Sequence, residues 1–239
     1  MHGIVMIPTY NEAQNIASLL ETILTLPLCN DDQLEVVVVD DNSPDGTANQ
    51  VKEIQKKFPD RLHLVIRTDK RGRGTAGIRG FQFCLERKVD CIFEMDADFS
   101  HDPKYLPLFL ALSRHYDLII GSRFVQDGID VHRSFARMFI SLIANSIYRL
   151  SLGLRIRDLA SGYKCYRKEL MQKLDFTKFL SHGYPIGMET VFYCHQLGAR
   201  CLEIPIRFED RRFGSSKFSF KEITEALRVS FQLFLKRFS

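Results

Sequence analysis

Short apolar runs recur along the first half of the chain, and a polar turn and an amphipathic stretch follow most of them. The runs cover residues 3–7, 34–39, 62–66, 91–95 and 118–120. Runs with so little polar alternation are typical of strands that are covered on both faces of a parallel sheet. The stretches between them have helical spacing. Five alternations of strand and helix therefore predict βαβ units in an α/β fold.

Turn and capping residues indicate where the intervening helices begin and end. Asn11 is expected to cap a helix over residues 12–24. The turn-rich segment 40–47 and the glycine-rich segment 70–77 should each lead into a helix. The ends of these two helices are expected near Phe58 and Arg87, and a further helix should open near Pro103.

The pattern changes after Arg123. Residues 135–152 and 220–238 combine apolar positions at helical spacing with basic residues. They predict amphipathic helices that either pack on the sheet or lie at a membrane interface. The remaining expected elements are a strand at 162–167, a helix at 188–196, an edge strand at 201–208 interrupted by Pro205, and a mobile basic loop at 209–217.

Composition restricts the class of protein. Of the 239 residues, 45% are hydrophobic and 26% are charged, as in an ordinary globular chain. No apolar run reaches the length of a membrane-spanning helix, and the first residues indicate a strand rather than a signal peptide. The six cysteines form neither a CxxC motif nor zinc-ligand spacing, which favours reduced thiols in a cytosolic protein.

Charge is distributed unevenly between the two halves. Residues 1–120 contain 13 basic and 18 acidic side chains, a net charge of −5, whereas residues 121–239 contain 20 and 11, a net charge of +9. An acidic first half is compatible with a metal site. A basic second half favours an anionic partner such as a phosphate, a membrane surface or a nucleic acid.

Two aspartates, Asp96 and Asp98, follow the apolar run at 91–95. In open α/β sheets, ligands bind outside the carboxyl ends of the strands. Two carboxylates at that place can hold a hard divalent cation, and Mg²⁺ commonly completes its shell with water and substrate phosphates. Taken alone, the pair is equally compatible with a solvated acidic turn.

Polar residues also follow the other predicted strands. Tyr10 and Glu12 follow the first, and Asp40 and Asp41 follow the second. Together with the aspartates at 96 and 98 they describe a nucleotide site with a metal at one side. The segment 72–77 matches the GxGxxG dinucleotide motif, but it follows the third strand instead of the first. This position favours close packing or ligand approach over an NAD(P) site.

Eight ordered segments resemble the family 2 inverting glycosyltransferases. They are IPTYNE (7–12), VVDDNSPDGT (38–47), RGRGTAG (71–77), MDADFSHDP (95–103), GSRF (121–124), SGYKCYRKE (161–169), YPIGMET (184–190) and DRRFGSSK (210–217). The match covers nearly the whole chain and is most similar to the dolichol-phosphate (polyprenol-phosphate) mannose synthases of that family. It implies a GT-A type fold, a Rossmann-like and mostly parallel sheet flanked by helices, with amphipathic helices near the C-terminus. It also implies one catalytic domain over 1–239, with a nucleotide- and metal-binding half (1–123) and an acceptor- and membrane-facing half (124–239).

The resemblance implies transfer of mannose from GDP-mannose to dolichyl or polyprenyl phosphate with inversion, assisted by Mg²⁺ or Mn²⁺. The residue types agree with this chemistry. A departing nucleoside diphosphate needs a cation and basic groups to neutralise its charge, and arginine binds phosphate through two donors at once. The acceptor phosphate is already an anion, so no strong general base is required.

Roles are implied for individual residues by their place in the family motifs. Nucleotide-sugar binding is implied for Pro8, Tyr10, Glu12, Val39, Asp41, Asp96, Ala97, Asp98 and Arg123. Catalytic roles are implied for Asp98, Arg123, Arg211 and Lys217, and acceptor-phosphate binding for Arg137, Arg211 and Lys217, with Arg212 as a further candidate. The implied metal ligands are Asp96, Asp98 and Ser100, where family members often have Gln in place of the serine.

Many family members carry transmembrane helices near the C-terminus, and residues 1–239 contain none by sequence. We therefore expect a cytoplasmic protein, peripheral to the membrane, that acts with or without an integral membrane subunit and binds no nucleic acid. Three alternatives remain. The same fold can use a UDP-sugar such as UDP-glucose or another acceptor, the glycine motif can belong to an NAD(P)-dependent oxidoreductase, and the chain can be a non-enzymatic anion-binding membrane protein.

Overall fold

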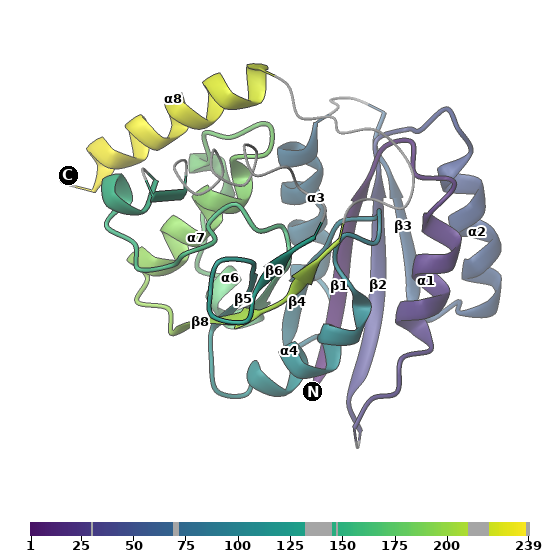
Figure 1. Ribbon diagram of the computed structural model, residues 1–239. Coiled ribbons are helices and arrows are strands. Elements are labelled where there is room, and N and C mark those ends of the chain that lie inside the picture. The colour runs from purple at the N-terminus through teal and green to yellow at the C-terminus, as the bar shows by residue number, and fades with distance from the viewer. Residues whose placement is uncertain (30, 69–71, 132–144, 147, 210–219, 238–239) are drawn as a thin grey trace.

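The computed structural model describes residues 1–29, 31–68, 72–131, 145–146, 148–209 and 220–237. A seven-stranded sheet runs through the molecule in the order β3-β2-β1-β4-β7-β5-β8, with helices on both faces (Figure 1). A separate two-stranded sheet pairs β6 (Ile129–Asp130) with β9 (Arg207–Phe208). The α/β class predicted from the pattern of apolar runs is confirmed.

Four strands form the parallel half of the sheet. They are β1 (His2–Thr9), β2 (Gln33–Asp40), β3 (Leu62–Ile66) and β4 (Cys91–Glu94). Strand β1 pairs in parallel with β2 and β4, and β2 pairs in parallel with β3. All four strands correspond to predicted apolar runs, of which β1, β2 and β4 are almost completely buried and the edge strand β3 is only partly buried.

The second half of the sheet is mixed. Strand β7 (Lys164–Arg167) lies between β4 and β5 (Leu118–Ser122) and runs antiparallel to both. Strand β5 therefore does not pair with β4, but it runs in the same direction as β4, and the prediction of a mostly parallel sheet is confirmed. Strand β8 (Cys201–Pro205) pairs in parallel with β5 and forms the edge that Pro205 predicted.

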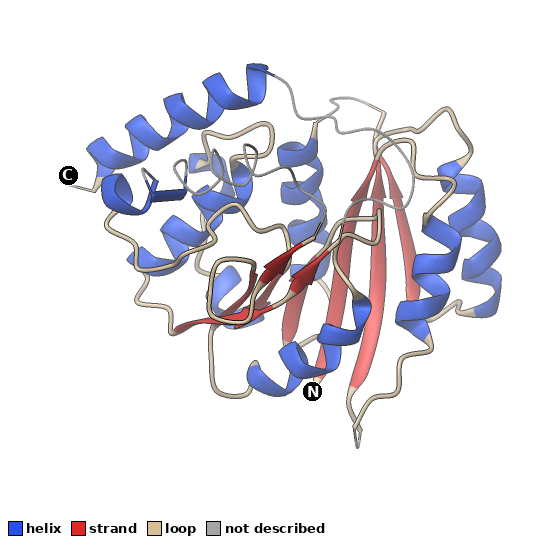
Figure 2. Cartoon of the chain, in the orientation of Figure 1, coloured by secondary structure: helices blue, strands red, loops and turns tan. Residues whose placement is uncertain are grey.

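The helices form two layers, one on each face of the sheet (Figure 2). On one face lie α1 (Ile16–Leu24), α2 (Thr47–Lys57) and α4 (Leu106–Leu112), which pack against side chains such as Val5 and Ile7. On the other lie α3 (Arg73–Leu85), α6 (Lys168–Met171), α7 (Ile186–Gln196) and α8 (Phe220–Lys236), which pack against side chains such as Ile4 and Met6. Short 3-10 helices, η1 (Pro103–Tyr105) and η2 (Phe176–Lys178), complete the elements described.

Two predicted helix starts are wrong. Helix α1 begins at Ile16, and Asn11 has a positive φ of 57° instead of the extended conformation of a cap. The Asn11 N–H donates to Ser43 Oγ at 2.9 Å, so this residue belongs to the turn that joins the ends of β1 and β2. Helix α3 begins at Arg73, inside the glycine motif and not after it.

The predicted helix at 135–152 falls largely outside the described residues, and so does most of the predicted loop at 209–217. Of the former, residues 145–146 and 148–152 are described, and they are helical. None of the helices within the described ranges has the length and apolar character that crossing a bilayer requires.

Candidate active site

The carboxyl ends of β1, β2 and β4 meet at one edge of the sheet. In the parallel ladders Thr9 is paired with Asp40, and Met6 with Glu94. The turns that follow these strands therefore carry Tyr10 to Glu12, Asp41 and the aspartates at 96 and 98 to the same edge. This is the place where open α/β sheets bind ligands.

The two aspartates after β2 hold different loops in place. Asp40 is fully buried and accepts hydrogen bonds from Thr9 Oγ1 at 2.8 Å and from the Ser43 hydroxyl at 2.6 Å. Asp41 pairs with Arg67 at 2.9 Å and accepts a hydrogen bond from the Gly72 N–H at 2.8 Å. Asp40 thus orders the turn after β2, and Asp41 ties that turn to the start of α3.

The residues with implied nucleotide contacts differ in exposure. Tyr10 and Glu12 are half-buried at the strand end, and the Glu12 N–H donates to Thr47 Oγ1 at 2.9 Å. Pro8 is also half-buried, whereas Val39 and Ala97 bury their side chains in the core. Any contact that a ligand makes with Val39 or Ala97 must therefore use their main chain.

The carboxylate of Asp98 is held by a neighbour on its own loop, and that of Asp96 is held by the first residue of α3. Asp98 is 3% exposed and accepts hydrogen bonds from the Ser100 hydroxyl at 2.6 Å and the Ser100 N–H at 3.1 Å. The side chain of Asp96 is 25% exposed, and its Oδ1 accepts a hydrogen bond from Arg73. Phe99, between these contacts, has a positive φ of 62°, a strained conformation of the kind that clusters at functional sites.

A buried charge cluster lies beneath Asp96. Glu94 lies 3.6 Å from Arg73 and 3.9 Å from Lys164, and it accepts a hydrogen bond from the Tyr166 hydroxyl at 3.3 Å. Burial lowers the pKa of Lys164, although the carboxylate of Glu94 opposes this effect. Burial would also lower the pKa of Arg73, but the charges of Asp96 and Glu94 outweigh it and raise that pKa. Arg73 is therefore a permanent cation facing two carboxylates.

His101 supports Asp96 through the main chain, and the sequence reasoning did not single it out. The ring is 1% exposed, stacks on Tyr163 with centroids 5.0 Å apart, and accepts a hydrogen bond from the Asp96 N–H at Nδ1 over 3.1 Å. Burial lowers the pKa of His101, and neighbouring carboxylates only partly oppose this effect. The only signal for it was its place in the SHDP part of the motif.

Arg123, after β5, is anchored by Asp158. Its Nε and Nη2 each donate to a carboxylate oxygen of Asp158 at 2.8 Å, and its main-chain N–H donates at 3.0 Å. Asp130 lies 4.0 Å away, and Arg123 is 8% exposed. Burial would lower the pKa of Arg123, but the charge of Asp158 outweighs it and raises that pKa. Sequence reasoning missed Asp158. The basic candidates Arg137, Arg211, Arg212 and Lys217 lie outside the described residues.

Close packing explains Gly74 of the GxGxxG segment. A Cβ on Gly74 would lie 2.6 Å from the carbonyl oxygen of His182 and 2.8 Å from that of Gly183. The first amides of α3 are occupied, since Gly72 N–H donates to Asp41 and Gly74 N–H donates to the His182 carbonyl at 3.0 Å. A dinucleotide pyrophosphate would need those amides. The motif therefore does not support an NAD(P) site.

The chemistry of the donors at this edge fits a hard divalent cation. No group of three or more His, Cys, Asp or Glu side chains able to hold a metal ion occurs among the described residues. Asp96 and Asp98 nevertheless supply carboxylate oxygens, and Mg²⁺ in nucleotide sites commonly takes only one or two carboxylates. The pair fits a cation whose remaining ligands are phosphate and water oxygens.

Comparison with known proteins gives matches over nearly the whole chain. The protein family described as Glycosyl transferase family 2 matches residues 4–175 of this chain. Polyprenol monophosphomannose synthase of Mycolicibacterium smegmatis is 38% identical over 225 residues, which are 94% of this chain and 83% of that protein. Undecaprenyl-phosphate mannosyltransferase of Micrococcus luteus is 38% identical over 229 residues, which are 95% of this chain and 91% of that protein.

Similar solved structures include two of glucosyl-3-phosphoglycerate synthase from Mycobacterium tuberculosis. One holds Mn²⁺, UDP and glucosyl-3-phosphoglycerate, with a TM-score of 0.67 and 17% identity over 99% of this chain and 79% of that chain. The other holds Mg²⁺ and UDP, with a TM-score of 0.66, the same identity and the same coverage. At this identity the likeness concerns the fold.

Proposed function

Because this chain belongs to glycosyltransferase family 2, we propose that it transfers mannose from GDP-mannose to a polyprenyl phosphate, with inversion at the anomeric carbon. The chain is a glycosyltransferase, and its α/β fold is of the GT-A type. The observation that carries the proposal is the 38% identity, over at least 94% of the chain, to two relatives named for mannose and a polyprenyl phosphate.

The proposed donor site lies in residues 1–123. Tyr10, Glu12 and Asp41 would bind the nucleotide at the ends of β1 and β2, with Pro8 and the main chain of Val39 and Ala97 beside them. Asp96 and Asp98 would hold Mg²⁺ or Mn²⁺, which supplies positive charge to the diphosphate leaving group. Ser100 orients Asp98 through its two hydrogen bonds, whether or not it also ligates the cation.

The proposed acceptor site lies in residues 124–239. A phosphate monoester is an anion near neutral pH, so it can attack the anomeric carbon without a general base. The basic side chains must attract and orient it, and arginine suits this role because its donors match two phosphate oxygens. Arg123, fixed by Asp158, stands at the boundary of the two halves, and Arg137, Arg211, Arg212 and Lys217 remain the proposed acceptor ligands.

Access to a lipid acceptor requires contact with a membrane, and we propose that the protein is peripheral to it on the cytoplasmic side. Helix α8 supports this proposal. It buries Val229 and Leu233 against the fold, yet Leu227, Phe231 and Leu235 are 54%, 63% and 52% exposed. These three lie at four-residue spacing and form a second apolar stripe on the helix. An integral membrane subunit could supply the same contact.

A turnover assay tests the function. Purified protein would receive polyprenyl phosphate, Mn²⁺ and a panel of radiolabelled GDP- and UDP-sugars, and label in the organic phase would be counted. We expect label from GDP-mannose, lost with EDTA. Asp98→Ala should lower the rate by at least about 100-fold, since even the outer partners of metal ligands matter by 10- to 100-fold.

Asp102→Asn is the matched control for this variant. Asp102 lies on the same loop and accepts a hydrogen bond from the Lys104 N–H at 3.0 Å, a role that Asn can also fill, so its activity should remain near that of the unmodified protein. Label from a UDP-sugar would show that the donor is not GDP-mannose and would leave the proposed mechanism unchanged. Lipid product from no donor, under any metal, would contradict the proposal.

A further inference from the structure

One end of the buried charge cluster beneath the candidate metal ligands is open to a ligand. The side chains of Lys164 and Glu94 are 0% and 4% exposed, whereas those of Arg73 and Asp96 are 17% and 25% exposed. Asp96 is a proposed metal ligand, and Arg73, which donates to it, has no part in the proposed function. A partly exposed guanidinium thus lies beside the candidate metal site without an assigned role.

Three segments hold the guanidinium of Arg73. It donates to Asp96 Oδ1 in the loop after β4, and its central carbon lies 5.3 Å from the ring centre of Tyr184 in the loop before α7. A Cβ on Gly162, in the segment before β7, would lie 2.8 Å from Arg73 Nη2. These neighbours restrict Arg73 to one orientation, which a residue that selects among ligands requires.

The loop that carries Tyr184 is itself anchored. The carboxylate of Glu189 accepts hydrogen bonds from the N–H groups of residues 180 and 181 at 2.7 and 2.9 Å. The carbonyl of His182 accepts a hydrogen bond from the Gly74 N–H at 3.0 Å, next to Arg73 on α3. The ring of Tyr184 therefore has a fixed base from which it limits the movement of the guanidinium.

The charges around Arg73 favour a neutral ligand over an anion. Two carboxylates face its single positive charge, Asp96 in direct contact and Glu94 at 3.6 Å. Their charge balances that of the guanidinium, and they would repel a phosphate placed against it. A neutral ligand that carries hydroxyl groups meets no such repulsion.

Arg73 and Asp96 together offer a donor beside an acceptor. An arginine side chain has five N–H donors. Within the part of the chain that the structure describes, Arg73 makes one hydrogen bond, to Asp96. A sugar hydroxyl both donates and accepts, and a carboxylate accepts several hydrogen bonds. One hydroxyl group can therefore accept from Arg73 while it donates to the partly exposed Asp96.

We propose that Arg73 is a specificity-determining residue that binds a hydroxyl group of the donor hexose, an inference that rests on the proposed function. In a sugar nucleotide the hexose is bonded directly to the diphosphate. The cation proposed at Asp96 and Asp98 would bind that diphosphate, which brings the hexose close to Asp96 and its partner Arg73. A site that hydrogen-bonds a hydroxyl group discriminates against ligands that lack it.

Calorimetric titrations with Mn²⁺ and without acceptor test this contact. The Kd values of GDP-mannose and of GDP would be measured for the unmodified protein and for Arg73→Lys. The variant should raise the Kd of GDP-mannose by about tenfold and that of GDP by less than about twofold, because lysine keeps the charge but not the planar fork of donors. An equal rise for both ligands would overturn the proposal, since Arg73 would then act on the nucleotide or the cation.

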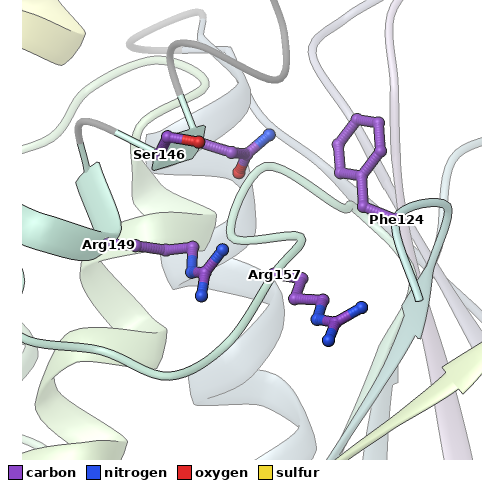
Figure 3. A pocket seen from close by; sticks show the side chains of 5 residues that line it. Phe124, Ser146, Arg149 and Arg157 are labelled. Carbon is purple, nitrogen blue, oxygen red and sulfur yellow. The ribbon is translucent and has the colours of Figure 1, made fainter.

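Two control variants replace an arginine elsewhere. Arg79 is exposed on the same helix. Arg157 lines a separate cavity of about 270 Å³ with Phe124 and Arg149, and Figure 3 shows its side chain extending into that space. Arg79→Lys and Arg157→Lys should leave both Kd values within about twofold. A rise in the GDP-mannose Kd as large as that of Arg73→Lys in either control would also contradict the assignment.

A double-mutant cycle identifies the hydroxyl group. GDP-mannose analogues that each lack one hydroxyl group would be titrated into the unmodified protein and into Arg73→Lys. The analogue that lacks the contacted hydroxyl should bind more weakly than GDP-mannose to the unmodified protein, and about as well as GDP-mannose to the variant. If every analogue loses the same factor in both proteins, Arg73 does not contact the sugar.

The same titrations distinguish this contact from a loss of folding and from a failure of the proposed function. Each comparison uses two ligands on one sample, so partial unfolding cancels. Tyr184→Leu keeps Arg73 but removes the ring that holds it, and it should raise the Kd of GDP-mannose more than that of GDP. If a UDP-sugar binds and GDP-mannose does not, the proposed donor is wrong, and the UDP-sugar compared with UDP then tests Arg73 in the same way.

Discussion

Arg73 balances the charges beneath the candidate metal ligands. It donates to Asp96 and lies 3.6 Å from Glu94, a carboxylate that is 3% exposed. Its guanidinium packs closely against Gly162, since a Cβ on that residue would lie 2.8 Å from Arg73 Nη2. Removing one partner of a buried pair leaves an uncompensated charge, which commonly costs about 3–5 kcal/mol.

We therefore expect Arg73→Met to lower the free energy of unfolding by about 3 kcal/mol, measured by urea denaturation. Arg73→Lys, which keeps the charge, should lose less. Arg79→Met is the control, because Arg79 is exposed on the same helix, and it should change stability by no more than about 0.5 kcal/mol. If Arg73→Met and Arg79→Met were equally stable, the cluster would not depend on Arg73.

At the residue scale the sequence indicated the candidate metal ligands but not the residues that hold them in place. Asp96 and Asp98 were visible because they directly follow an apolar run. Asp158 and Glu94 were not, because their partners are distant in sequence, and Asp158 is 35 residues from Arg123. Local spacing reports what one strand or helix presents, whereas ion pairs between segments appear only when the fold brings them together.

The start of α3 shows how one element constrains the site. Gly74 approaches the carbonyls of residues 182 and 183 so closely that a Cβ would meet them at 2.6 to 2.8 Å, and the Gly74 N–H donates to the first of them. The loop at residues 182–183 is also bonded to α8, since the His182 N–H donates to Glu225 Oε1 at 2.6 Å. Helices α3 and α8 are thus joined through one loop.

Gly74→Ala should destabilise the protein by about 1–3 kcal/mol, because a methyl group must displace backbone. Gly77→Ala is the control from the same motif. It has no atom within 4 Å of its Cβ position, so it should be neutral or stabilising by roughly 0.5–1 kcal/mol, as expected for alanine in a helix. Chemical denaturation of both variants measures the difference. Equal effects of the two substitutions would contradict the packing explanation.

Among the elements, the regular ones were predictable and the exceptions have local causes. Strands β1 to β4 followed from their apolar runs, which are buried in β1, β2 and β4 and partly buried in the edge strand β3. Strand β7 was expected as a short strand, but its direction depends on how the chain returns after the segment before it, which no period in the sequence encodes. Helix α1 starts later than predicted, at Ile16, and the Asn11 N–H donates to Ser43 in the neighbouring turn instead of lying at the start of the helix.

At the scale of the whole molecule, α8 has one face that packs on the fold and another that is proposed to contact the membrane. One face is held to the body, by the buried Val229 and Leu233 and by Lys236, which donates to the Tyr193 hydroxyl at 2.9 Å. The other face exposes large apolar side chains, and residues 121–239, to which α8 belongs, have a net charge of +9. The sequence predicted an amphipathic helix but could not show that its apolar residues divide between two faces.

The exposed stripe gives the prediction that belongs to the whole molecule. A variant with Leu227→Gln, Phe231→Gln and Leu235→Gln should lose binding to anionic vesicles by on the order of 100-fold, since each half-exposed apolar side chain can gain about 1 kcal/mol on transfer from water. Vesicle co-sedimentation measures the loss. The activity on farnesyl phosphate in solution should stay within about twofold, because the stripe faces away from the fold.

Leu108→Gln serves as the control, since Leu108 is 48% exposed on α4, which packs on the opposite face of the sheet. It should bind vesicles as well as the unmodified protein does. Retained vesicle binding in the α8 variant would exclude the stripe as the membrane contact. Loss of activity on both the soluble and the vesicle-borne acceptor would indicate that the substitutions disturb the Glu225 contact to the 182–183 loop. These measurements therefore distinguish membrane binding by the apolar face of α8 from orientation of the acceptor phosphate by basic side chains.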